Sequence, residues 1–279
     1  ATKEVEGIEL GDTIKDKELP LIDFGRVAAQ TAKQIVVQRV KEAEKQSISG
    51  EFQDKDGELM VGTLSREDQK NYFVDLGRAS GILPKDQIIP GEKLVMGSSV
   101  KVYVSKLELG PKGPFIMLSR SHYGFVKRLL EIEVPELNDG TVMLYSVARD
   151  AGSRTKIAVY TEYNNVDPIG AVIGEKGRRI AAVLKELNGE KIDVILYDKD
   201  PVKFITNALS PAKDIKVTIK DENKKEALAV VGDNNLSLAI GKRGQNVKLA
   251  SRLTHYKIEV KSQSAVNEEN AEEVEASEK

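Results

Sequence analysis

The sequence predicts a multidomain α+β protein built from a helical segment, a small β-rich domain and two copies of one α/β unit. Three observations predict it. Apolar residues follow helical spacing from Asp23 to Gln46; short alternating runs separated by glycine and proline turns fill residues 49–120; and one strand–helix–glycine turn–helix–strand pattern occurs twice after residue 140. With 279 residues, 40% of them hydrophobic, the chain can form several small cores.

The first helix carries a stripe of small and branched apolar residues, Ala28, Ala32, Ile35, Val36, Val40 and Ala43. A helix with so few large apolar side chains needs a partner surface to be stable. We expect this surface to come from the rest of its own domain or from another protein.

Five alternating runs predict the strands of the β-rich domain: Ser49–Phe52, Leu59–Leu64, Asn71–Leu76, Val100–Leu107 and Phe115–Ser119. Five short strands in roughly seventy residues favour a small OB-type barrel. Alternation places Val74 and Leu76 inside and Phe73 outside, where its ring can stack on a base or remain an ordinary surface aromatic. The segments Phe73–Gly77 and Gly81–Pro84 resemble the ribosomal-type RNA-binding branch of this fold. That branch often has a second ring or His where this chain has Pro84, so we expect this barrel to bind RNA poorly or only to assist.

The repeated unit centres on a Gly-x-x-Gly turn, Gly174 to Gly177 in the first copy and Gly241 to Gly244 in the second, offset by 67 positions. Glycine pairs allow a bulky ligand to approach the backbone, and the helix that follows offers free N–H groups and the positive end of its dipole. Such a turn suits a phosphate chain.

The order of elements around each turn is that of a KH domain, whose loop holds about four nucleotides of single strand. A helix and a strand precede each core, as in the bacterial (type II) arrangement. For the first unit we expect a helix over His122–Leu137 and strands over Thr141–Arg149 and Ser153–Tyr160; for the second, a helix over Pro201–Leu209 and strands over Ile215–Lys220 and Ala227–Val231. The short connector Asp198–Pro201 should fix the units side by side, so that their RNA tracks join.

The candidate RNA contacts are the glycines, cations and amides of the two loops and nearby cations. They are Gly174, Lys176, Gly177, Arg178, Arg179, Gly241, Lys242, Arg243, Gly244, Gln245, Asn246 and Lys248, with Arg154, Lys156 and Phe73 as further contacts. Cations neutralise phosphates, while Gln245 and Asn246 either read base edges or cap the helix. Glu175 should weaken the first loop relative to the second.

The formal net charge of −2 comes from the C-terminal end. Residues 263–279 contain six Glu and one Lys, so the remainder of the chain carries about +3. We expect 263–279 to be a disordered acidic tail, either solvated or competing with RNA for the basic groove.

Composition and motifs argue against several other classes. The chain has no Cys, no apolar run of eighteen residues and no signal-peptide core, which favours a cytoplasmic protein without a membrane partner. Nucleotide-binding and zinc-protease motifs are lacking, and His122 and His255 lie far apart. We expect no catalytic residue, metal or cofactor.

Long stretches resemble the NusA family of bacterial transcription factors. They are Asp23–Gln34, Val147–Val159, Asp167–Ala171 and Asn235–Val247. The resemblance implies a monomeric factor that binds RNA polymerase and binds the nascent transcript as single-stranded RNA. It also implies that the factor acts with other Nus-type factors and modulates pausing, termination and antitermination. It also implies these divisions: 1–47, the end of a polymerase-binding domain that looks truncated; 48–121, the barrel; 122–198 and 199–262, the KH domains; 263–279, the tail.

Two alternatives stay open at this stage. KH and OB modules also occur in ribosome-associated and RNA-decay accessory proteins, because a fold alone does not choose a function. An enzyme acting on free nucleotides is the more distant alternative.

Overall fold

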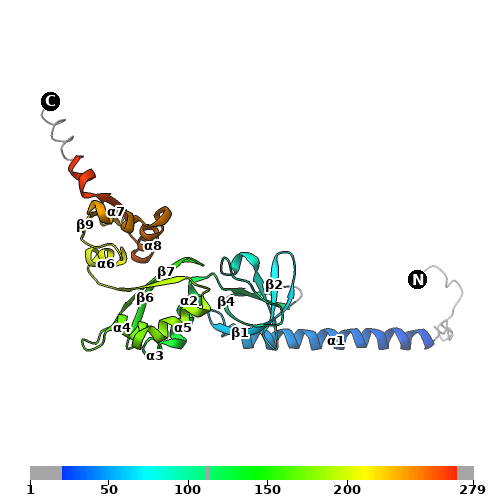
Figure 1. The fold of residues 1–279 in the computed structure, drawn as a ribbon. Coiled ribbons are helices and arrows are strands. Elements are labelled where there is room, and N and C mark those ends of the chain that lie inside the picture. The colour runs from blue at the N-terminus through cyan, green and yellow to red at the C-terminus, as the bar shows by residue number, and fades with distance from the viewer. Residues whose placement is uncertain (1–20, 111–112, 269–279) are drawn as a thin grey trace, which may run out of the picture. The chain divides into compact units, whose positions relative to one another are not determined.

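The computed structural model describes residues 21–110 and 113–268, and contacts divide the chain into two units, 1–51 and 52–279. The described residues of the first unit all belong to the long helix α1 (Leu21–Gln53; Figure 1), whose last two residues fall in the second unit. The predicted helix is therefore confirmed, with Val27, Val36 and Val40 exposed along it. The first twenty residues, which the sequence assigned to the same domain, lie outside the part of the chain that the structure describes.

The predicted strand at Ser49–Phe52 is wrong, because these residues are the last turns of α1. A four-residue alternation fits a helix as well as a strand, and extending an existing helix needs no new nucleus. The fifth strand is instead β3 (Ser80–Pro84), a segment that lies outside the five predicted runs. Gly81 fits this strand because a Cβ there would collide with the Leu118 side chain.

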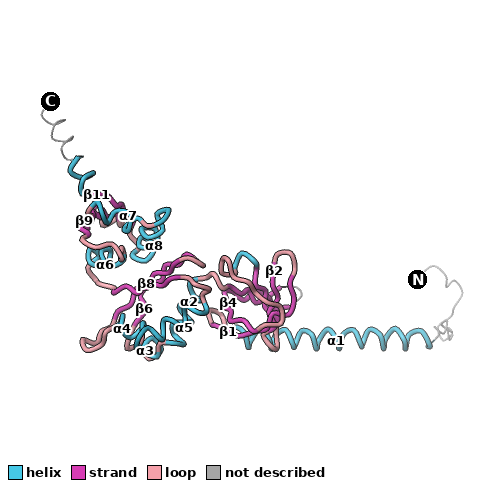
Figure 2. Tube along the Cα trace, viewed as in Figure 1, coloured by secondary structure: helices cyan, strands magenta, loops and turns pink. Residues whose placement is uncertain are grey.

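Five strands form a closed barrel in the order β1-β2-β3-β5-β4. Figure 2 colours strands magenta and labels β1, β2 and β4 of this barrel. Their bounds are β1 Leu59–Glu67, β2 Asn71–Asp75, β3 Ser80–Pro84, β4 Ser99–Gly110 and β5 Gly113–Ser119, with the short helix η1 at Lys85–Gln87. The barrel core includes Leu64, Val74, Leu83, Val102, Val104, Ile116 and Leu118. The predicted OB-type barrel is confirmed, and Val74 points inward as alternation required.

The first KH unit follows the barrel. Its elements are α2 Tyr123–Glu133, α3 Pro135–Asn138, β6 Met143–Asp150, β7 Arg154–Tyr160, α4 Pro168–Ile173, η2 Glu175–Gly177, α5 Arg178–Glu186 and β8 Lys191–Leu196. In its sheet β7 lies between antiparallel β6 and parallel β8. The helix expected to reach Leu137 breaks at Val134, because Pro135 disfavours helical backbone in the residue before it.

The second unit repeats this topology. Its elements are α6 Pro201–Ala208, β9 Ile215–Asp221, β10 Glu226–Val231, α7 Asp233–Ile240, η3 Lys242–Gly244, α8 Gln245–Thr254 and β11 Lys257–Ser262, with β10 between antiparallel β9 and parallel β11. The predicted tail begins with six helical residues, 263–268, anchored where Ser264 Oγ donates to Asp233 Oδ1 at 2.6 Å. Its remainder, 269–279, lies outside the described part.

The two KH units share one apolar core. Helix α8 of the second unit packs on β6 and β7 of the first, and Ala158 of β7 clusters with Leu249 and Ala250 of α8. As a result β7 is buried on both faces, whereas β10 of the second unit alternates buried and half-buried residues. The short connector thus joins two units that pack directly on each other.

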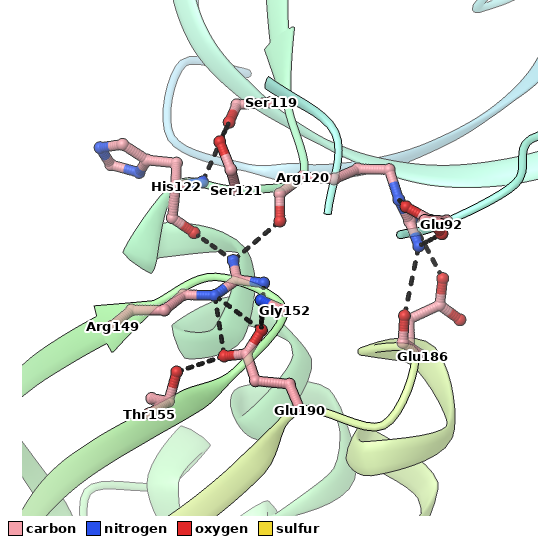
Figure 3. Close-up of polar contacts among 10 residues, drawn as sticks. All are labelled: Glu92, Ser119, Arg120, Ser121, His122, Arg149, Gly152, Thr155, Glu186 and Glu190. Carbon is pink, nitrogen blue, oxygen red and sulfur yellow. Dashed lines mark hydrogen bonds and ion pairs between the residues drawn. The ribbon is translucent and has the colours of Figure 1, made fainter. Parts of the chain in front are cut away.

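A buried ion pair fixes the junction between the barrel and the first KH unit (Figure 3). The Arg149 guanidinium pairs with Glu190 at 2.9 Å, and their side chains are 2% and 0% exposed. Arg149 also donates to the backbone oxygens of Arg120 and His122, each at 2.8 Å. Arg120 in turn pairs with Glu92 at 2.6 Å and Glu186 at 3.1 Å. No sequence pattern indicated this network.

Candidate nucleic-acid interface

The two Gly-x-x-Gly loops have the same backbone conformation. Gly174 and Gly241 both have φ 73°, with ψ 170° and 172°, and the second glycines, Gly177 and Gly244, have φ 76° and 74°. The residue before each second glycine is also left-handed, Lys176 in one loop and Arg243 in the other. A side chain is strained at such φ values, so the repeat preserves one particular turn.

The two glycines of each loop serve different purposes. A Cβ on Gly174 would lie 2.7 Å from Arg179 Cγ, and one on Gly241 would lie 2.7 Å from Asn246 Cβ, so the first glycine allows the loop to pack on its following helix. Around Gly177 no atom of the described structure lies within 4 Å of an added Cβ. At Gly244 an added Cβ would meet only Lys248 Cε at 3.8 Å and Val247 Cγ1 at 4.0 Å, so both second glycines leave room for a ligand backbone to approach.

Positive charge surrounds this open side. Lys176 and Arg178 are exposed at the first loop, and Lys242, Arg243 and Lys248 at the second. Among the described residues no side chain caps the N-terminus of α5 or α8. The first N–H of each helix already donates to a backbone oxygen, Arg178 N to Glu175 O and Gln245 N to Lys242 O, but the helix dipoles still favour negative charge at these ends.

Arg179 and Asn246 occupy equivalent positions, and each side chain bonds to the helix that precedes its loop. Arg179 donates to Ala171 O at 2.7 Å and pairs with Glu136 at 2.8 Å. Asn246 Nδ2 donates to the backbone oxygens of Leu238, Ala239 and Leu209, at 3.2, 3.0 and 3.0 Å. Both side chains thus tie the helix before the loop to the helix after it.

The prediction that Asn246 reads bases or caps its own helix is wrong in this structure. The residue is 3% exposed, and its amide hydrogens are directed at carbonyls of α6 and α7. An amide with three backbone acceptors inside the protein has no edge to offer RNA. Sequence spacing alone could not distinguish this position from its exposed neighbours.

The prediction that Lys156 contacts RNA is also wrong, and the positive charge of Arg154 is largely neutralised by a carboxylate. Lys156 is 0% exposed; its Nζ lies 3.1 Å from Asp193 Oδ2, and burial lowers its pKa. Arg154 forms two hydrogen bonds to Asp193, at 2.6 and 2.9 Å. The sequence predicted both side chains as further RNA contacts, but α8 packs on that face of the sheet.

Gln245 contacts the first KH unit. Its Nε2 donates to Asp150 Oδ2 and, at 2.7 Å, to Ser153 Oγ. Phe73 is half-buried on β2, and the Arg66 guanidinium lies 3.9 Å from its ring centroid. One face of that ring is thus already occupied by a cation.

The loops differ in their electrostatic surroundings. A cavity of about 650 Å³ beside the first loop is lined by Glu133, Glu136 and Glu175, together with Arg178, Arg179 and backbone of α4. At the second loop, Lys242 takes the position of Glu175. The second loop is therefore the more attractive of the two for a polyanion.

A closed OB-type barrel followed by two packed KH units with cationic Gly-x-x-Gly loops defines a class of RNA-binding protein. Residues 1–46, 120–197 and 201–268 match the family models for the NusA N-terminal domain, the NusA-like first KH domain and the NusA-like second KH domain. The chain belongs to the NusA family. Its KH domains indicate RNA binding, and its NusA relatives indicate a role in transcription.

The curated relatives carry the name transcription termination/antitermination protein NusA. The protein of Halalkalibacterium halodurans is 48% identical over 257 residues, which cover 92% of this chain and 67% of that protein. The Bacillus subtilis protein is 48% identical over 270 residues (95% and 72%), and the Thermus thermophilus protein 45% identical over 254 residues (90% and 65%). Within the described residues no helix is long and apolar enough to cross a membrane, and no His, Cys, Asp and Glu side chains group as a metal site.

Proposed function

We propose that this chain is a transcription factor that binds nascent RNA as a single strand across its two KH loops, contacts RNA polymerase, and modulates pausing, termination and antitermination. The observation that supports it most is the duplicated loop: two turns of one conformation, each with exposed cations and an uncapped helix N-terminus, held on units that share a core. Such a surface binds a polyanion and performs no reaction on it, so we propose a binding protein without catalytic activity.

The proposed RNA contacts are the exposed members of the predicted set. They are Lys176, Arg178, Lys242, Arg243 and Lys248, with the backbone of Gly174, Gly177, Gly241 and Gly244. Two loops that each hold about four nucleotides need a strand of about ten to be occupied together. Phe73 stays a proposed base-stacking residue of the barrel.

Polymerase contact is proposed for the N-terminal unit. Residues 1–46 match the NusA N-terminal domain, and α1 exposes Val27, Ile35, Val36 and Val40. An apolar stripe of this kind is stable when a partner surface covers it. We further propose a cytoplasmic monomer that acts together with other Nus-type factors.

Backbone amide exchange with a single-stranded RNA of about ten nucleotides tests the RNA-binding part of this proposal. We expect protection at residues 174–179 and 241–248, and no comparable protection with a duplex of the same sequence. Protection confined to the barrel, or equal protection by the duplex, would refute it. Capture of RNA polymerase by the chain, compared with a variant carrying Val36→Asp and Val40→Asp, tests the polymerase contact.

A further inference from the structure

Three polar side chains meet where the second loop touches the first KH unit. Gln245 directly follows Gly244, and its Nε2 donates to Asp150 and to Ser153, which flank the turn between β6 and β7. Asp150 and Ser153 are exposed and Gln245 is half-buried. We call these three residues the junction trio.

The trio keeps unused hydrogen-bonding capacity toward solvent. Both hydrogens of the Gln245 amide point at the trio itself, and Asp150 Oδ1 has no partner among the described residues. The Ser153 hydroxyl accepts from Gln245, so its own hydrogen remains available. The trio therefore presents a carboxylate, a hydroxyl and an amide that can turn outward.

The trio lies directly beside the second loop. Gln245 is the first residue of α8 and follows Gly244, the second glycine of that loop. Under the proposed function, a phosphate held by Lys242 and Arg243 brings its nucleotide beside the trio. The trio is largely exposed, and the two units already share an apolar core through Ala158 and Leu249, so holding the units together does not require it.

We propose that the junction trio selects guanine at one position of the bound strand, an inference that rests on the proposed function. The Watson–Crick edge of guanine carries the O6 acceptor beside two donors, N1–H and N2–H. Gln245 Nε2 exchanges its hydrogen bond to Ser153 for one to O6, and the two Asp150 oxygens accept from N1–H and N2–H. Adenine, cytosine and uracil have only one donor on this edge, so each leaves one carboxylate oxygen without a partner.

The selectivity belongs to the second loop alone. The position equivalent to Gln245 in the first loop is Arg178, an exposed cation that reads phosphate rather than base. One guanine per site, at a fixed distance from the end of the bound strand, is therefore expected.

The test measures affinity for oligoadenylates of about ten nucleotides in which a single guanosine is moved through every position. For the wild-type chain we expect one position where guanosine binds about tenfold more tightly than adenosine, the range of a good bidentate base contact. Inosine, which lacks the N2 donor, should lose part of this gain there. Gln245→Ala should reduce the preference.

Asp150→Asn distinguishes a trio that recognises a base from a trio that only holds the two KH units together. It should abolish the guanosine preference and raise affinity for plain oligoadenylate, because a negative charge beside the phosphates is removed. Asp214→Asn, an exposed aspartate of the second unit with the same charge change, serves as the control and should keep the preference. If wild-type chain binds all positions alike, or Asp150→Asn weakens every RNA equally, the inference is overturned. Absence of any single-strand binding would instead overturn the proposed function.

Discussion

Lys156 of the first KH unit donates its ammonium group to the backbone oxygen of Ser210 in the second, at 2.8 Å. The same nitrogen lies 3.1 Å from Asp193 Oδ2, so the charge is paired inside the protein. A residue that resembles a phosphate contact in the sequence is therefore part of the interface between the two units.

Replacing Lys156 by Met tests this assignment. We expect the slope of log affinity against log salt for single-stranded RNA to stay unchanged, because the ammonium group reaches no phosphate. The free energy of unfolding should change by less than about 1.5 kcal/mol, since Met has similar volume and Asp193 keeps Arg154 as a partner. A shallower salt slope would return Lys156 to the RNA-contact set.

Asp193→Asn should be more damaging, because it leaves the Lys156 charge buried without a carboxylate. We expect a loss of about 3 kcal/mol in unfolding free energy at pH 7, measured by urea denaturation. Burial raises the pKa of Asp193, but hydrogen bonds and charges from Arg154 and Lys156 outweigh it and hold this pKa below its ordinary value of 3.8.

The same pair gives a pH dependence. A carboxyl group with a lowered pKa in the folded state stabilises the protein above its ordinary pKa, and this stabilisation is lost as pH falls through the lower folded value. The stability difference between wild type and Asp193→Asn should thus be complete above about pH 3.8 and shrink below it. A constant difference down to pH 2 would contradict the ion pair.

The loops should respond unequally to the same substitution. Gly244→Asp should weaken binding of a ten-nucleotide strand more than Gly177→Asp, because Glu175, Glu133 and Glu136 already weaken the first loop. Both glycines have positive φ, so backbone strain is matched between the two variants. Equal losses of affinity, with equal melting temperatures, would show that the carboxylates are irrelevant.

Lys242 and Arg243 should account for measurable counterion release. Lys242→Ala together with Arg243→Asn should lower the salt slope by roughly 0.7 for each phosphate that the protein no longer neutralises. Asn is chosen at 243 because it tolerates the left-handed φ of 54°. Lys224→Ala removes an exposed lysine far from the loop in sequence. It is the matched control and should leave the salt slope unchanged.

Asn246 should matter through the loop it holds. Asn246→Ala removes the donor from three buried carbonyls, and we expect a loss of about 1–3 kcal/mol in unfolding free energy and weaker RNA binding at the second loop. Asn246→Asp should be worse, because it directs a carboxylate at the same oxygens. Unchanged stability in both would show that the hydrogen bonds are replaceable by water.

Local patterns in the sequence determined the long first helix, four of the five barrel strands and the topology of both KH units. These follow from neighbouring residues, through the hydrophobic period and the glycine turns. The Gly-x-x-Gly loops were also predictable from the sequence. Glycine is required at Gly174 and Gly241 by close packing, and at Gly177 and Gly244 by a left-handed backbone.

Tertiary structure alone decided which polar groups near the loops face solvent. Lys156 and Asn246 look like their exposed neighbours in sequence, yet helix α8 covers one, and the ends of α6 and α7 surround the other. The pairing of Arg149 with Glu190 and the meeting of Gln245 with Asp150 join residues 41 and 95 positions apart. No local periodicity encodes such contacts, because they arise only when separately folded units pack and bury each other's surfaces.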